Sequence, residues 1–244
     1  MTLAQDRVIL YPDSDGQPRA DNTLQFRWIV LIKENLECLF QHRSDVFVAG
    51  DLLWYPVEGH PEIRVAPDAM VVFGRPPGDP AGICYAVRGS YRQWQEANIA
   101  PQVVFEVLSP GNTLKEMAKK LAFYERYGVE EYYIYDPDRL DFTGYQRVND
   151  RLAVIEMASA WVSPRLQIRF VLTPTQLEIY DPSGQRFLTM QELSQRLEQE
   201  QQRATLAEAI ADEERQRATL AELEVARLRA LLQQAGLGDG AIAD

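Results

Sequence analysis

Residues 101–137 constrain the fold of this chain more than any other segment. They read PQVVFEVLSPGNTLKEMAKKLAFYERYGVEEYYIYDP. An apolar, strand-forming run is followed by a polar turn, an amphipathic helical pattern and a second apolar strand that stops at Asp136-Pro137. Gly128 marks the end of the helix, because glycine readily adopts the left-handed conformation found there. The order of these elements predicts a fold in which helices pack on a sheet.

The first strand of this segment contains a charge where an apolar residue is expected. Glu106 lies inside the run VVFEVL, and burial of a carboxylate without a partner is costly. Asp68 takes a similar place upstream, where it opens the apolar strand of RVAPDAMVVF. Two carboxylates at strand positions, followed by a helix with lysines, are the ingredients of a metal-dependent nuclease centre. The simpler interpretation, that Asp68 only starts a strand after Pro67, stays open at this point.

The rest of the first 188 residues also alternates between helical and strand patterns. The segment Thr23–His42 has the apolar spacing of an amphipathic helix. A long connection over Arg75–Ile99 has a length that is often functional. Further strands are predicted at Val46–Tyr55, Ile63–Phe73, Phe142–Arg147, Leu152–Glu156, Gln167–Leu172 and Gln176–Tyr180.

The composition changes at Met190. From there to Gln234 the chain is rich in Ala, Leu, Glu, Gln and Arg, has no Gly or Pro, and repeats RATLAE after 14 residues, which is two heptads. A long helix is predicted, either paired in a coiled coil or simply solvated. We therefore expect a domain over 1–188, a helical tail over 189–235 and a disordered terminus over 236–244. One heptad register, which Glu214 interrupts, puts on one seam Ala204, Ala207, Ala211, Ala218, Ala221, Val225, Leu228 and Leu232.

The helix after Glu106 offers a cation for the candidate site. A phosphodiesterase with one or two metal ions needs oxygen ligands for Mg²⁺ or Mn²⁺ and a cation that polarises the phosphate. The position two residues after Glu106 is Leu108, not a lysine. Glu116, Lys120 and Tyr124 share one face of the helix at i, i+4 and i+8 spacing, so Lys120 can reach the carboxylates if that face meets the strand. An ordinary exposed Glu116–Lys120 pair is the alternative.

The charge of the chain argues against a broad nucleic-acid-binding surface. The net charge is −11, and it is not confined to the tail. From Thr189 onward there are 11 acidic and 6 basic residues, which leaves 25 acidic and 19 basic residues in the preceding part. Phosphate neutralisation by Lys and Arg supplies most non-specific affinity for nucleic acid. A nuclease of this composition would have to rely on metal ions and a local basic strip.

Several other classes of protein are disfavoured. No apolar run is long enough to span a membrane, and the N-terminus lacks the pattern of a secretory signal. Cys38 and Cys84 have no metal-binding spacing and are expected to be small buried residues, which suits a reducing cytoplasm. No Walker motif, dinucleotide fingerprint or serine nucleophile motif is present.

Three blocks of the sequence resemble the Uma-type family of restriction endonucleases. They are VAPDAMVVF, PQVVFEVLSPGNT and KEMAKKLAFYERYGVEEYYIYDP, in the family's order and spacing, and the likeness covers roughly residues 21–188. The resemblance implies the PD-(D/E)XK nuclease fold, a central mixed sheet flanked by helices. It also implies that Asp68 is the motif aspartate, Glu106 the motif glutamate and Lys120 the motif lysine, carried on the helix instead of the strand.

The resemblance leaves open which acidic residues join Asp68 and Glu106 at the site. The family often has Asp at the position of Glu116, so the role of this longer side chain as an outer ligand is in question. An acidic residue of the first helix often joins such sites, and Glu34 and Glu37 are both candidates.

Two hypotheses of function follow from these patterns. The first is a Mg²⁺- or Mn²⁺-dependent endonuclease that hydrolyses DNA, with Asp68 and Glu106 as metal ligands, Lys120 as the catalytic cation and Glu116 in support. The second is a weakly active or inactive nuclease fold that acts as a binding or assembly module. In both cases we expect a homo-oligomer, formed through residues 189–235, and no membrane association. RNA as the substrate stays open.

Overall fold

The structure described is a computed structural model. Its structure divides into two compact units, Met1–Phe187 and Leu188–Asp244. The disordered terminus expected over 236–244 and Cys84 both lie outside the described residues. The residues described are 9–14, 16, 20, 22–78, 88–156 and 160–235.

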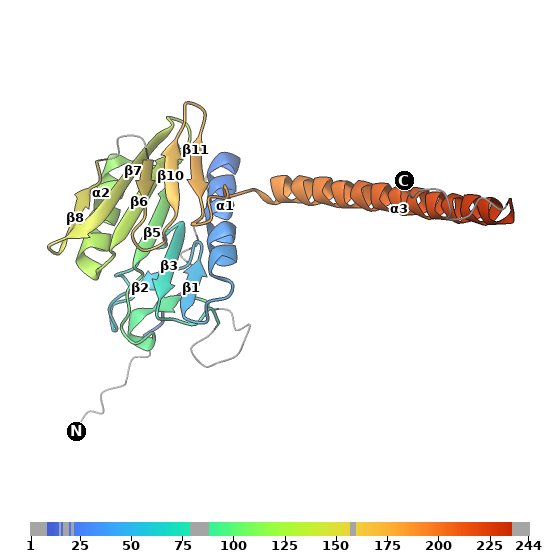
Figure 1. Ribbon diagram of the computed structural model, residues 1–244. Helices are drawn as coiled ribbons and strands as arrows, with labels where there is room; N and C mark the ends of the chain where they lie inside the picture. The colour runs from blue at the N-terminus through green and yellow to red at the C-terminus, as the bar shows by residue number, and fades with distance from the viewer. Residues whose placement is uncertain are drawn as a thin grey trace, which may run out of the picture. The chain divides into compact units, whose positions relative to one another are not determined.

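A mixed sheet forms the centre of the first unit (Figure 1). Within the described residues it has six strands in the order β1-β3-β5-β6-β7-β8. β5 and β6 run parallel and the other neighbours antiparallel, so the mixed α/β fold expected from the sequence is confirmed. The strands are β1 (Val46–Ala49), β3 (Ala69–Phe73), β5 (Val103–Val107), β6 (Glu131–Asp136), β7 (Asp141–Val148) and β8 (Arg151–Val154).

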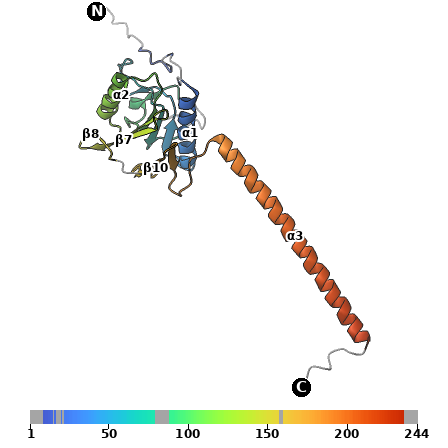
Figure 2. The same ribbon diagram turned by 90° about the horizontal axis from the view of Figure 1, so that it is seen from above.

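Two helices lie on opposite faces of this sheet, with the strands between them in Figure 2. One hydrophobic cluster joins α1 (Thr23–Phe40) to the sheet and to a small antiparallel sheet. A second cluster joins α2 (Leu114–Tyr127) to the other face and to the parallel pair β2 (Trp54–Tyr55) and β4 (Tyr91–Arg92). The small antiparallel sheet contains β9 (Ala160–Val162), β10 (Arg169–Leu172) and β11 (Leu177–Tyr180).

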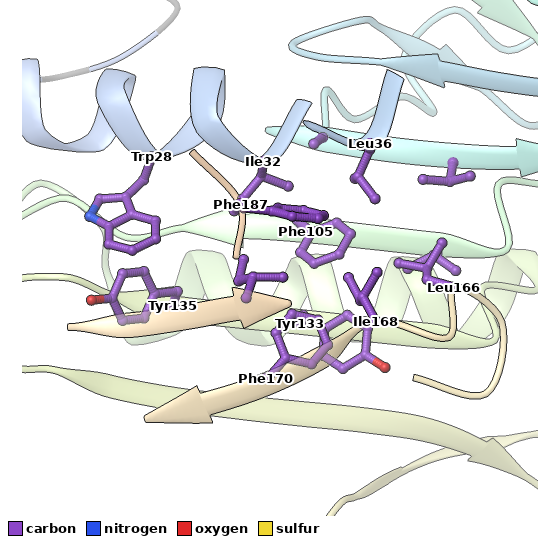
Figure 3. Close-up of a cluster of buried hydrophobic side chains, with 14 of the residues drawn as sticks. Trp28, Ile32, Leu36, Phe105, Tyr133, Tyr135, Leu166, Ile168, Phe170 and Phe187 are labelled. Carbon is purple, nitrogen blue, oxygen red and sulfur yellow. The ribbon is translucent and has the colours of Figure 1, made fainter. Parts of the chain in front are cut away.

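The helix α1 begins and packs as its sequence pattern predicts. The Asn22 side chain accepts a hydrogen bond from the backbone N–H of Gln25 at 2.8 Å and so caps the first turn. Trp28, Ile32 and Leu36 recur about once per turn and point into the core over Phe105 (Figure 3). Each such buried side chain contributes about 1.5–3 kcal/mol.

The helix α2 is fixed at both ends. Thr113 caps its first turn by accepting the N–H of Glu116, and Gly128 ends it at a φ of +94°. From β7, the Arg147 guanidinium donates to the carbonyls of Glu125 at 2.6 Å and Val129 at 2.8 Å. The bond to Glu125 satisfies a carbonyl that the helix end would otherwise leave without a partner, and both bonds tie the end of α2 to the sheet.

One strand expected from the sequence is interrupted. Residues 46–55 form β1 and β2 with a turn between them, because the backbone passes close to Asp68 at Gly50. A Cβ atom built on Gly50 would lie 3.3 Å from the Asp68 carbonyl oxygen, so glycine suits this approach. The next residue, Asp51, has a φ of +49°, and its N–H donates to the Pro67 carbonyl at 3.1 Å.

Three smaller expectations also differ from the structure. Of the strand expected over residues 63–73, only residues 69–73 form a strand, which is β3. Before it, Val65 forms an isolated bridge to Trp54. The strand β9 was not anticipated. Cys38, which we expected to be buried, is exposed on α1, because it lies off the apolar face of that helix.

The second unit consists of one long helix over its described residues. The helix α3 (Met190–Gln234) spans 45 residues and begins with a capping box between Thr189 and Glu192. None of the described α3 residues is buried. Over the described part of the chain, no helix has both the length and the apolar character that a membrane crossing needs.

Candidate functional site

The register of the sheet places the two predicted carboxylates side by side. β3 and β5 are antiparallel, and Ala69 pairs with Phe105. The next position along each strand is therefore Asp68 opposite Glu106. Successive side chains of β5 point to opposite faces of the sheet. Phe105 therefore points toward α1, and Glu106 points toward the face covered by α2.

Both carboxylate oxygens of Glu106 are held by residues of α2. Its Oε2 accepts a hydrogen bond from Lys120 Nζ at 2.7 Å, and its Oε1 accepts one from the Tyr124 hydroxyl at 2.5 Å. Glu106 is only 3% exposed, so these partners compensate for the burial of its charge. Burial, and then the charge of Glu106, raise the pKa of Tyr124 well above its ordinary value, so the phenol keeps its proton and acts as the donor.

Asp68 is held in place by the strand that carries Glu106. Its Oδ2 accepts the backbone N–H of Val107 at 2.6 Å. Burial is the main reason that the pKa of Asp68 lies well above its ordinary value, and the neighbouring Glu106 charge adds to the effect. Lys120 and the Val107 N–H act in the opposite direction but do not outweigh it.

Lys120 supplies the positive charge at these carboxylates. Burial by itself would lower its pKa, but the neighbouring carboxylate charges and the hydrogen bond to Glu106 together outweigh burial and raise it. Glu116, one turn earlier on α2, raises the Lys120 pKa further and accepts a long hydrogen bond of 3.4 Å from Asn112. The structure thus brings Asp68, Glu106 and Lys120 together, with Glu116 beside them.

The first helix contributes a residue, Gln25, that was not predicted from the sequence. Glu34 and Glu37 both bind Lys33, at 3.0 and 2.8 Å. Instead, buried Gln25 reaches the site, where its Nε2 donates to the Val107 carbonyl at 2.8 Å. A signal existed, because Gln25 is a polar residue on the apolar face of α1, about one turn before Trp28.

The donor set suits a small, hard cation that keeps part of its hydration shell. In the described residues there is no group of three or more His, Cys, Asp or Glu side chains that could hold a metal ion. The pair Asp68 and Glu106 offers oxygen ligands only. Mg²⁺ is usually bound by one or two carboxylates together with waters and substrate phosphates, so this pair fits Mg²⁺ or the similar Mn²⁺.

Binding of Mg²⁺ at this site is expected to release protons and to weaken as the pH falls. The raised pKa of Asp68 means that this carboxyl keeps its proton above the usual aspartate range, and a metal ion must displace that proton. The same shift also affects the stability of the fold. Because the pKa of Asp68 is higher in the folded protein than in the unfolded chain, this carboxyl stabilises the folded protein at low pH, and the contribution is lost as the pH rises through the folded-state pKa. Calorimetric titration with Mg²⁺ in two buffers with different heats of ionisation measures the number of protons released on binding. Equal binding heats in both buffers would contradict this expectation.

A comparison with protein-family models identifies the family of this chain. The family model of Uma2, described as "Putative restriction endonuclease", matches residues 13–175. A crystal structure titled as a putative nuclease belonging to DUF820 from Anabaena variabilis ATCC 29413 is 15% identical, covers 61% of this chain and 72% of its own, and has a TM-score of 0.42. No curated protein matches the chain. Because the family model covers more than half of the sequence, the resemblance seen in the sequence is confirmed, and this chain belongs to the Uma2 family of putative restriction endonucleases.

Proposed function

We propose that this protein is a metal-dependent endonuclease that hydrolyses phosphodiester bonds of DNA. The observation that carries the proposal is the contact of 2.7 Å between Lys120 Nζ and the buried carboxylate of Glu106, with Asp68 opposite Glu106 at the start of the neighbouring strand. An ordinary surface ion pair would not place a second carboxylate of raised pKa next to the first. Membership of the Uma2 family supports the same reaction class.

Each residue has a role that follows from its position. Asp68 and Glu106 would hold Mg²⁺ or Mn²⁺, which when bound supplies Lewis-acid activation of the phosphate and of the attacking water. Lys120 neutralises the negative charge that develops on the phosphoryl oxygens as the water oxygen bonds to phosphorus and the P–O bond of the chain breaks. Glu116 supports the site by adding its negative charge to those of Glu106 and Asp68, which raise the pKa of Lys120.

The charge of the protein suggests how it meets its substrate. With a net charge of −11, the protein offers little general attraction for a polyanion. Contact with DNA would therefore depend on the bound cation and on Lys120. RNA carries the same phosphate chemistry, so a parallel assay with RNA decides which nucleic acid is cut.

Plasmid nicking with Mg²⁺ and with Mn²⁺ tests the proposed function. We expect the wild type to nick supercoiled DNA, EDTA to stop the reaction, and Lys120→Met to lower the rate by about 10²–10³-fold, the usual cost of removing a charge-stabilising group. Lys119→Met is the matched control, because Lys119 is the adjacent lysine of α2 and is exposed. Equal loss in both variants, or no loss in either, would contradict the role of Lys120.

A second candidate function rests on the tail. The helix α3 carries large apolar side chains that are about half exposed, such as Leu228 and Leu232. We propose that residues 189–235 form a separate helical element that joins copies of the chain, while residues 1–188 form the nuclease domain. The protein could then act as an assembly module even with weak cleavage.

The free thiol of Cys38 fits a reducing cytoplasm, which is the location we propose.

A further inference from the structure

Tyr124 is held rigidly against the candidate site. The side chain is fully buried, and its ring stacks on Trp54 at an interplanar angle of 2° and packs edge-on against Tyr132 at 4.8 Å. Its hydroxyl donates to Glu106 Oε1 at 2.5 Å. Because the ring is packed on both sides, the hydroxyl cannot follow Glu106 if that side chain rotates. The hydrogen bond from Tyr124 therefore holds one carboxylate oxygen of Glu106 in place.

We propose that Tyr124 is a positioning residue that restricts Glu106 to one oxygen for the cation and thereby favours Mg²⁺ over Ca²⁺. The inference rests on the proposed function, because it assumes that Glu106 is a metal ligand. The other oxygen, Oε2, accepts a hydrogen bond from Lys120 at 2.7 Å, and its second lone pair is the one that we assign to the ion.

The two cations differ in what they require of a carboxylate. Ca²⁺ accepts six to eight oxygen ligands in flexible geometry and often takes both oxygens of one carboxylate. Mg²⁺ requires near-octahedral geometry and binds through few carboxylates together with waters. A Glu106 that offers a single fixed oxygen suits Mg²⁺. Without the Tyr124 hydroxyl, Oε1 becomes available, and Glu106 can take hold of Ca²⁺ with both oxygens.

The chain offers a matched pair of variants for the test. Tyr124→Phe removes the hydroxyl and keeps the ring on Trp54. Tyr132→Phe removes a neighbouring buried hydroxyl that has no hydrogen-bond partner among the described residues. Thermal unfolding of both variants verifies that they are folded before binding is measured.

Calorimetric titration with Mg²⁺ and with Ca²⁺ gives the ratio of the two affinities, which tests the inference. For Tyr124→Phe we expect Mg²⁺ affinity to fall by about 10-fold, as for other residues that orient a metal ligand, while Ca²⁺ affinity falls less or rises. Tyr132→Phe is expected to keep the wild-type ratio. A purely structural role of Tyr124 would weaken both cations alike, so an unchanged ratio in Tyr124→Phe overturns the inference while the proposed function stands.

Two further outcomes keep the inference and the proposed function distinguishable. A wild type that binds neither cation removes the proposed function and the inference with it. A crystal structure of the wild type with Ca²⁺ provides a test that does not depend on any variant. There we expect the Tyr124–Glu106 hydrogen bond to persist and one Glu106 oxygen to contact the ion. Contact through both oxygens would overturn the inference.

Discussion

Replacing Glu106 by glutamine is expected to abolish both metal binding and plasmid nicking. The amide has nearly the same shape as the carboxylate but carries no charge. Glu106 lies between Lys120 and Tyr124, which both donate hydrogen bonds to it. A glutamine can offer its oxygen to only one of these donors, and its NH₂ group then faces the other. Of the two proposed ligands only Asp68 then carries a charge, and the neighbouring Lys120 offsets it, so the attraction for a divalent cation falls steeply.

The expected size of the effect is large. Cleavage should fall by at least about 10³-fold, at the upper end of what one charge-stabilising group contributes. Mg²⁺ binding should be undetectable by calorimetry. The charge of Glu106 also helps to raise the pKa of Asp68, so Asp68 in the variant should ionise at lower pH. Asp68→Ala is expected to lose cleavage in the same way.

The matched control for this variant is Glu130→Gln. Glu130 is a carboxylate next to the start of β6, and it pairs with Arg165 instead of with a site residue. This change should leave metal affinity and nicking at wild-type levels. If Glu106→Gln kept its Mg²⁺ affinity, Glu106 would not be a ligand, and the contact with Lys120 would be a structural ion pair only.

Local signals explain why the segment around the site was predictable. The helix over residues 114–127 was expected because an amphipathic pattern follows the polar turn and Gly128 marks its end, and the structure adds Thr113 as the cap of its first turn. The apolar runs on either side of it form β5 and β6. The charge of Glu106 within such a run pointed to the site, because a buried carboxylate needs a partner.

The parts that could not be predicted depend on contacts between distant segments. The break between β1 and β2 arises where Gly50 approaches the Asp68 carbonyl, and no local pattern encodes that approach. The contact of Gln25 with Val107 joins residues 82 positions apart. The sequence placed Tyr124 on the same helix face as Lys120, but its hydrogen bond to Glu106 depends on how α2 packs on the sheet.

Pairing of the α3 helices would give their exposed apolar residues a partner surface. An isolated helix has little stability of its own in water, and most helical stability in proteins comes from packing of one face. The α3 seam includes Val225, Leu228 and Leu232, which are 48–50% exposed in the single chain. Leucines on such a seam pack between the residues of a facing helix in a coiled coil. A second copy of the chain carries the same seam and is the partner we propose.

Removing residues 189–244 is therefore expected to convert an oligomer into a monomer. Light scattering coupled to size exclusion should give a multiple of 27.9 kDa for the full chain and the mass of a single shortened chain for residues 1–188. Leu228→Glu, on the seam, should dissociate the full-length protein, since a charge at a seam position opposes pairing. Leu223→Glu is the matched control, because Leu223 is exposed on the opposite side of the helix and should leave the mass unchanged. A monomeric full-length wild type would remove the tail from any role in self-association, while the nuclease proposal would stand on Asp68, Glu106 and Lys120 alone.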